Sequence, residues 1–321
     1  MDKIRNQYFY KVISLLIKSG ILIFSFYYIW QKIVEAEKNI NISEYLTLSK
    51  LSVLTILFLL MLINWSLEAA KWKILIAPLE SISFYKSLIS VFAGVTASIF
   101  TPNRIGEFTG RVFFLEKADK IQATFKSFIG SAAQLFITIS AGLISVFAYY
   151  INRSNLLVPE GSLTIRIILF SVAIIILATV FLFLVYHFRG RMPVKFRSYV
   201  SAFFEIKRKD LFLIVLLSAI RYFVFTFQYY LILKTFNVPV DFKTAFMLIA
   251  LTFLVTSAIP TFALTEIAVR GASAVYFFSM IGAEPSVVVA ASFTVWLINL
   301  ALPALIGSIF VWKLQFFKDR K

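Results

Sequence analysis

The stretch TPNRIGEFTGR, residues 101–111, places charges and helix breakers together inside a strongly apolar chain. Arg104, Glu107 and Arg111 stand here among one proline and two glycines. Of the 321 residues, 60% are hydrophobic and only 15% are charged, and the mean hydropathy is +0.87. A soluble fold cannot bury so much apolar surface, so the composition predicts an integral membrane protein.

Apolar runs of about 20 residues, enough for a helix to cross a hydrocarbon core of about 30 Å, recur along the whole chain. The ten-residue alternating segments of a membrane β-barrel are absent from the sequence. We therefore predict an all-α, polytopic helical bundle that forms a single transmembrane domain over residues 1–321. The predicted spans are 9–31, 51–76, 122–150, 165–187, 211–236 and 286–313.

The positive charges indicate how the chain is oriented. The net charge of +16 is concentrated in short loops between apolar runs, which is typical of membrane orientation rather than of nucleic-acid binding. The strongly basic loop 189–210 predicts a cytoplasmic location, with both termini on the same side, in the cell membrane. This orientation is consistent along the chain only if 84–115 and 242–282 are hairpins that enter and leave on one side.

The two predicted hairpins resemble each other. Phe84 aligns with Phe242, and Pro102 with Pro260, at a constant offset of 158. With one inserted residue, Glu107 aligns with Glu266 and Arg111 with Arg270, so the Glu–Arg pair of the first hairpin recurs in the second. We therefore predict two related halves, 51–150 and 211–313, joined through the span 165–187. The chain crosses the membrane an odd number of times between the two halves. We therefore predict that they have opposite orientations in the membrane, as inverted repeats.

Broken helices in inverted repeats are typical of transporters, whose substrates bind where the helix ends converge. A charged side chain at that depth costs a few kcal/mol, so it is a functional candidate by default. The alternative is an ordinary helix-stabilising i, i+4 pair, but two copies behind equivalent prolines favour a site. The predicted substrate-binding residues of the hairpins are Arg104, Glu107, Arg111, Glu266 and Arg270, with Pro102, Gly106 and Pro260 as the hairpin breakers.

Other polar residues within the spans leave more than one interpretation open. Glu68 and Lys71 either line the cavity or mark the interfacial end of a span, with the lysine reaching toward the head groups. Arg221 lies well inside its span and is a candidate for the cavity. His187, the single histidine, ends a span and is expected to be interfacial. Four further residues are expected to join helices by hydrogen bonds, namely Lys126, Gln134, Gln228 and Asn299.

The same segments carry a resemblance to a known family. The sequences TPNRIGEFTGR, KWKIL and IPTFALTEIAVRG resemble the transmembrane region of the lysylphosphatidylglycerol synthase family, the flippase-like domain of bifunctional aminoacyl-lipid proteins. Pro102, Gly106, Glu107 and Arg111 match the first motif of the family. The second motif departs from the pattern, because Thr265 stands where a glycine is usual.

The resemblance implies movement of phospholipids or other polar-headed lipids between leaflets. The partner expected on this basis is a membrane lipid with an anionic or phosphate-containing head group. Synthesis of aminoacylated lipid is not expected, because this sequence lacks the aminoacyl-transferase domain of the bifunctional members.

Two other classes of function stay open, a membrane-embedded lipid-modifying enzyme and a non-transporting scaffold. No paired carboxylates with metal-ligand spacing, no histidine beside a nucleophile and no cysteine occur in the sequence. We therefore predict no catalytic residues, no metal and no cofactor. The sequence also lacks a G-x-x-x-x-G-K-[ST] nucleotide-binding loop, so passive or ion-coupled transport is expected.

Overall fold

The computed structural model describes residues 51–99, 101, 104–151, 206–259 and 263–311, together with four separate positions between 23 and 34. Within these residues the regular structure is entirely helical, as the sequence predicts. The predicted span 165–187, nearly all of 9–31 and most of loop 189–210 lie outside the described residues. Pro102, Pro260 and His187 lie outside them as well.

Long apolar helices form the frame of the molecule. They are α3 (Leu51–Ile76), α6 (Lys120–Ile151), α9 (Arg208–Thr235) and a continuous stretch over Pro285–Val311. Each is long and apolar enough to cross a membrane, which confirms four of the predicted spans. Several large apolar side chains point outward, including Phe136, Phe147 and Phe212, as suits contact with lipid tails.

The last of these helices contains a π-helical turn in its middle. It consists of α12 (Pro285–Trp296), a π-helical turn η6 (Leu297–Ala301) and α13 (Leu302–Val311). Pro303 follows the π-helical turn and has no backbone N–H to donate to the preceding turn. Short π-helical segments of this kind are frequent at functional sites.

Both predicted hairpins are present, and each breaks where the sequence predicts. The first consists of α4 (Phe84–Ile99) and α5 (Gly106–Val112), and the second of α10 (Phe242–Ala258) and α11 (Ala263–Phe278). The two are unequal, because α5 has 7 residues and α11 has 16. At about 1.5 Å per residue, α5 is only about 10 Å long and cannot cross a membrane.

Glycines allow the arms of the first hairpin to touch. A Cβ atom on Gly110 would lie 2.8 Å from the Cα atom of Gly94, and one on Gly106 would lie 2.2 Å from the carbonyl oxygen of Ala97. Such separations are shorter than real Cβ contacts. Gly106 is therefore required for close packing against α4.

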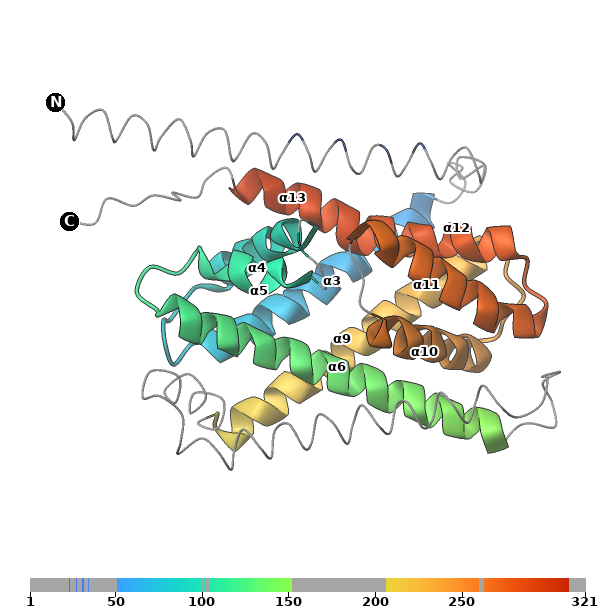
Figure 1. Cartoon of the computed structure of the whole chain (residues 1–321), viewed down its shortest axis with the longest axis horizontal. Helices are drawn as coiled ribbons and strands as arrows, with labels where there is room; N and C mark the ends of the chain where they lie inside the picture. Colours follow the sequence, from blue (N-terminus) through green and yellow to red (C-terminus); the bar gives the residue numbers. More distant parts are fainter. Residues whose placement is uncertain are drawn as a thin grey trace.

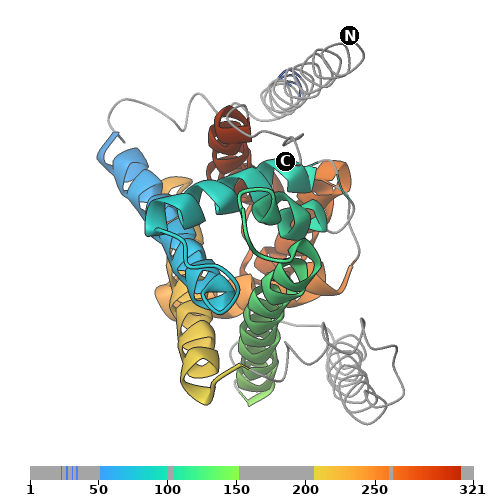
Figure 2. The same cartoon turned by 90° about the vertical axis from the view of Figure 1, so that its left-hand side faces the viewer.

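Each half of the chain packs its hairpin against the last helix of the other half. Helix α4 contacts α13, and α10 contacts α6, while α3 and α9 contact each other between them. Figure 1 shows the hairpins at opposite ends of the long axis, and Figure 2 shows the same bundle from its left-hand end. This reciprocal packing agrees with two related halves. The predicted inversion of the halves across a membrane stays a prediction.

Two glycines allow close contacts between the halves in this arrangement. A Cβ on Gly307 would lie 2.0 Å from the carbonyl oxygen of Phe92 and 2.4 Å from Oγ1 of Thr96. A Cβ on Gly142 would lie 2.7 Å from Cβ of Leu254. Leu254 follows Thr96 at the same offset of 158 that relates the two hairpins. The two interfaces therefore share one corresponding position, while Gly142 and Gly307 are 165 residues apart and do not correspond at that offset.

Candidate functional site

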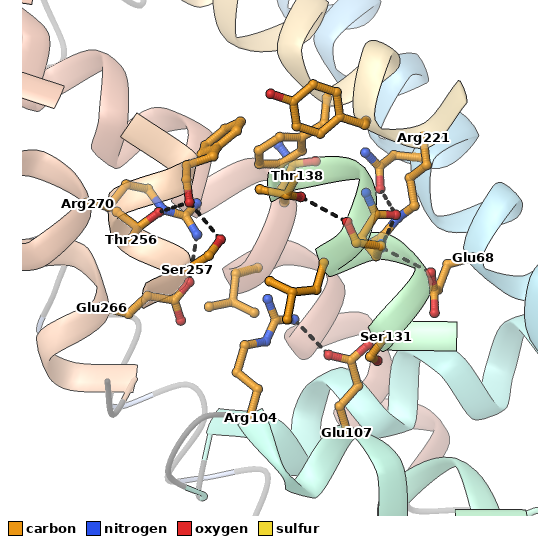
Figure 3. Close-up of a pocket in the computed structure, with 18 of the residues that line it drawn as sticks. Glu68, Arg104, Glu107, Ser131, Thr138, Arg221, Thr256, Ser257, Glu266 and Arg270 are labelled. Carbon is orange, nitrogen blue, oxygen red and sulfur yellow. Dashed lines mark hydrogen bonds and ion pairs between the residues drawn. The ribbon is translucent and has the colours of Figure 1, made fainter. Parts of the chain in front are cut away.

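A cavity of about 580 Å³ lies between the two halves of the bundle. Charged or polar side chains from α3, α5, α6, α9, α10, α11 and η6 border it, and Figure 3 shows how the principal ones converge. Among the predicted site residues, those that line the cavity are Glu68, Lys71, Arg104, Glu107, Arg221, Glu266 and Arg270.

Glu68 is the centre of an ion-pair cluster on one side of the cavity. Its Oε1 accepts a hydrogen bond of 2.8 Å from Nη1 of Arg111, and its Oε2 lies 2.8 Å from Nζ of Lys71 and 3.0 Å from Nη1 of Arg221. The side chains of Glu68 and Lys71 are 2% and 1% exposed. Both residues are therefore inside the bundle, and the lysine does not reach outward toward the head groups.

The positions on α3 explain how one helix supplies several of these groups. Asn64, Glu68 and Lys71 are spaced by four and three residues, so their side chains project from the same face of the helix. Trp65, the residue after Asn64, stacks against the guanidinium of Arg221, whose Cζ is 5.1 Å from the ring centre. Asn64 fixes the same guanidinium, because its Oδ1 accepts a 2.8 Å hydrogen bond from Nε.

Arg111 is placed differently from the sequence-based expectation. Its side chain is 1% exposed and does not border the cavity. The guanidinium pairs with Glu68 from α3 and with Glu107 one helical turn earlier on α5. Gly94 makes room for it, since a Cβ there would lie 2.9 Å from Cγ of Arg111. The geometry makes Arg111 a buried link that holds two carboxylates in place.

Arg104 stands at the hairpin break and faces the cavity. Its backbone is in the left-handed region, with φ of 57°, which is uncommon for a residue other than glycine. Its Nη2 lies 3.2 Å from Oε2 of Glu107, and its side chain is 35% exposed. Figure 3 shows this side chain reaching into the space between the Glu68 cluster and the opposite pair.

The opposite side of the cavity carries the second Glu–Arg pair. Nη2 of Arg270 donates a 2.7 Å hydrogen bond to Oε1 of Glu266, and the two side chains are 15% and 12% exposed. At an offset of 158 from Glu68, α9 carries Thr226, so no second carboxylate corresponds to the one that binds Arg111. The two copies of the motif are therefore chemically unequal, and Arg270 is the more accessible arginine.

Three of the four residues expected to join helices do so by hydrogen bonds, namely Gln134, Gln228 and Asn299. Nε2 of Gln228 donates a 2.7 Å hydrogen bond to the carbonyl of Leu57, and Nδ2 of Asn299 donates one of 2.8 Å to Oε1 of Gln228. Asn299 and Gln134 both line the cavity. Lys126 is buried and does not border it.

Sequence reasoning missed several polar lining residues, because single serines and threonines are common in apolar helices. A usable signal existed on α6, where Ser131, Gln134 and Thr138 are spaced by three and four residues and form one polar stripe. The missed lining residues with polar side chains are Asn64, Ser131, Thr138, Tyr222, Thr256 and Ser257. Within the described part of the chain, no group of three His, Cys, Asp or Glu side chains is placed to hold a metal ion.

A comparison with models of protein families matches residues 12–307 to the lysylphosphatidylglycerol synthase TM region. The chain belongs to this family. The match covers most of the sequence, so it confirms the resemblance seen in the short motifs. Membership in the lysylphosphatidylglycerol synthase TM region family associates the protein with membrane lipids. Comparisons with curated proteins and with solved structures gave no match.

Proposed function

We propose that this member of the lysylphosphatidylglycerol synthase TM region family moves a polar-headed lipid between the two leaflets of the membrane. The observation that carries the proposal is the charged cavity between the two halves of an otherwise apolar bundle. In this mechanism the head group enters the cavity, while the lipid tails stay among the outward-facing apolar side chains.

The free-energy cost of keeping charged side chains around this cavity supports a role in binding. Ionised groups inside a membrane protein are expensive and mark substrate pathways when they line a polar space. Here four cations and three carboxylates border one cavity that two interrupted hairpins and a π-helical turn enclose. Transporters bind their substrates in such places, because broken helices present unpaired backbone groups there.

The arginines divide into two roles in the proposed mechanism. Arg104, Arg221 and Arg270 border the cavity and bind the phosphate of the head group by charge-assisted hydrogen bonds. Glu266 orients Arg270 and binds a cationic part of the head group where one is present. Arg111 positions Glu68 and Glu107 from behind the cavity wall, so it does not contact the lipid.

The test is translocation by the purified full-length chain in phosphatidylcholine vesicles that contain an acyl-labelled fluorescent lipid. Quenching of the outer leaflet with a membrane-impermeant reductant measures how much labelled lipid moves outward. We expect faster movement than in protein-free vesicles, and a loss of at least about tenfold in rate for Arg270→Ala. Arg208→Ala is the matched control, because Arg208 is exposed at the start of α9.

Two results would overturn the proposal. One is equal movement in vesicles with and without protein for acidic and zwitterionic labelled lipids. The other is movement by Arg270→Ala at the wild-type rate. Mass spectrometry of the recovered lipids separates translocation from chemical modification, because a translocated lipid keeps its mass.

A further inference from the structure

The charges at the site do not cancel. Five cations and three carboxylates belong to it when Arg111 is included with the lining residues, so two positive charges are in excess. The Glu266–Arg270 pair cancels itself. The whole excess therefore lies on the Glu68 side, where Lys71, Arg104, Arg111 and Arg221 accompany only Glu68 and Glu107.

The excess charge reaches the cavity through two of these four cations. Lys71 and Arg111 are 1% exposed, and their charged ends are already engaged with carboxylates. Arg104 and Arg221 are 35% and 19% exposed and border the cavity. A ligand therefore meets the uncompensated positive charge at these two guanidinium groups.

Both guanidinium groups keep hydrogen-bonding capacity for a ligand. Arg104 uses Nη2 for Glu107, which leaves its Nη1 available, while its Nε is buried. Arg221 uses Nε for Asn64 and Nη1 for Glu68, which leaves its Nη2 available. The planar fork of arginine matches phosphate oxygens, so two such groups facing one cavity favour a phosphate over a single hydrogen-bonded hydroxyl.

The backbone of Arg104 supports the same conclusion. A non-glycine residue in the left-handed region costs of order 1 kcal/mol or more, and such residues cluster at ligand sites. The conformation carries the side chain toward the centre of the cavity in Figure 3. A glycine at this turn would remove the strain but also the charge.

We propose that the cavity is selective for a phosphate group that carries two negative charges, as in a phosphomonoester head group, with Arg104 and Arg221 as its specificity-determining residues. An uncompensated charge in a low-dielectric site is costly, and a ligand of charge near −2 cancels the excess. A phosphodiester cancels half of it, and a zwitterionic head group cancels none. The cavity volume of about 580 Å³ lies in the range of about 300–1,000 Å³ typical of sites for small molecules. The inference deepens the proposed function, since it names the head group that would be translocated.

The experiment measures binding rather than transport. The wild-type chain in a non-ionic detergent is titrated with phosphatidic acid, phosphatidylglycerol and phosphatidylcholine of equal tail length, and ligand-induced thermal stabilisation gives each Kd. Glycerol 3-phosphate and inorganic phosphate form a second arm without tails. We expect phosphatidic acid to bind about tenfold more tightly than phosphatidylglycerol, and phosphatidylcholine to bind most weakly.

The variants Arg104→Gln and Arg221→Gln each remove one excess charge without leaving a carboxylate alone. Glu107 keeps Arg111, and Glu68 keeps both Lys71 and Arg111. Each variant is expected to weaken phosphatidic acid binding about tenfold and to narrow its advantage over phosphatidylglycerol. The control Arg208→Gln is expected to bind as the wild type does.

Equal Kd values for the three lipids, or unchanged selectivity in both variants, would overturn the inference. If the protein translocates zwitterionic lipid but binds the three lipids equally, the inferred selectivity is overturned and the proposed function stands. Tight binding of glycerol 3-phosphate with no gain from tails would identify a free phosphomonoester as the ligand. That outcome would support the selectivity and contradict lipid translocation.

Discussion

Arg111 of α5 and Glu68 of α3 form a 2.8 Å ion pair between side chains that are 1% and 2% exposed, although 43 residues separate them in the sequence. The pair joins the first hairpin to the first long helix of its half. Glu68 also holds Lys71 and Arg221, so one carboxylate fixes charges from three helices. The integrity of the site therefore depends on this carboxylate.

We expect Glu68→Gln to destabilise the protein by about 3–5 kcal/mol, because breaking a buried ion pair leaves its cationic partners without compensation. The measurement is the thermal unfolding midpoint of the purified chain in detergent. Glu266→Gln is the comparison, since Glu266 has one arginine partner and is 12% exposed. A loss no larger than that of Glu266→Gln would show that Glu68 is not the structural centre of the cluster.

The interface between α4 and α13 predicts that Gly307 tolerates no side chain. The Cβ of Gly307→Ala would meet the carbonyl oxygen of Phe92 at 2.0 Å, so the two helices must separate, at a cost of about 1–3 kcal/mol or more. The unfolding midpoint should fall. Gly271→Ala on α11 is the control, because nothing lies within 4 Å of its added Cβ. This control should leave stability unchanged or raise it slightly, and a similar fall in both variants would contradict the packing argument.

Glu80, in the loop between α3 and α4, predicts a dependence of stability on pH. Its Oε2 accepts hydrogen bonds of 2.7–3.0 Å from the backbone N–H groups of residues 116–118, and its Oε1 lies 3.3 Å from Nζ of Lys86. Burial alone raises the pKa of this carboxyl, but the backbone donors and Lys86 outweigh it and lower the pKa below the usual 4.5. Because the folded-state pKa is the lower one, the stabilisation is complete above about pH 4.5 and is lost as the pH falls through the folded-state pKa.

The test compares unfolding midpoints of wild type and Glu80→Gln from about pH 7 downward. The wild type should be the more stable protein near neutral pH, and the difference should shrink as the pH falls below about 4.5. Glu116→Gln serves as the control, because Glu116 also pairs with Lys86, at 3.2 Å, but its side chain accepts none of the backbone hydrogen bonds described for Glu80. A difference that stays constant with pH would contradict the role of the ionised carboxylate.

The predicted inversion of the two halves places the ends of the two hairpins, away from their breaks, on opposite sides of the membrane. Lys117 follows the first hairpin and Glu284 follows the second, and both are exposed. The sequence contains no cysteine, so Lys117→Cys and Glu284→Cys each introduce a single thiol. A membrane-impermeant maleimide applied to intact cells should label position 284 but label position 117 only after permeabilisation. Labelling of both from the same side would contradict the inversion.

The fold was predictable to a large extent because its signals are local in the sequence. A run of about 20 apolar residues must form a helix in lipid, since every backbone group has to be satisfied within the segment. The bounds of α3 and α9 and the breaks in both hairpins could therefore be placed without tertiary information. The inequality of α5 and α11 could not, because how far each helix continues past its break depends on what it packs against.

The site was only partly predictable, because charge pairing is not local. The sequence indicated that Glu107 and Arg111 were functional candidates, but it could not indicate that a carboxylate from α3 would bury the arginine. The equivalent position on α9 carries Thr226, so Arg270 stays accessible although its local motif is the same. Repetition in the sequence suggested equal roles for two arginines that the tertiary environment makes unequal.

The sequence by itself determined that this chain is a helical membrane protein with two interrupted hairpins and charged residues at the interruptions. Hydropathy and helix breakers act within a few helical turns, so the positions of the helices and of their breaks can be derived from the amino-acid sequence alone. Only the tertiary structure decided which charges cancel and which face the cavity. Compensation of a buried charge requires a partner within about 4 Å, and helices distant in sequence supply that partner.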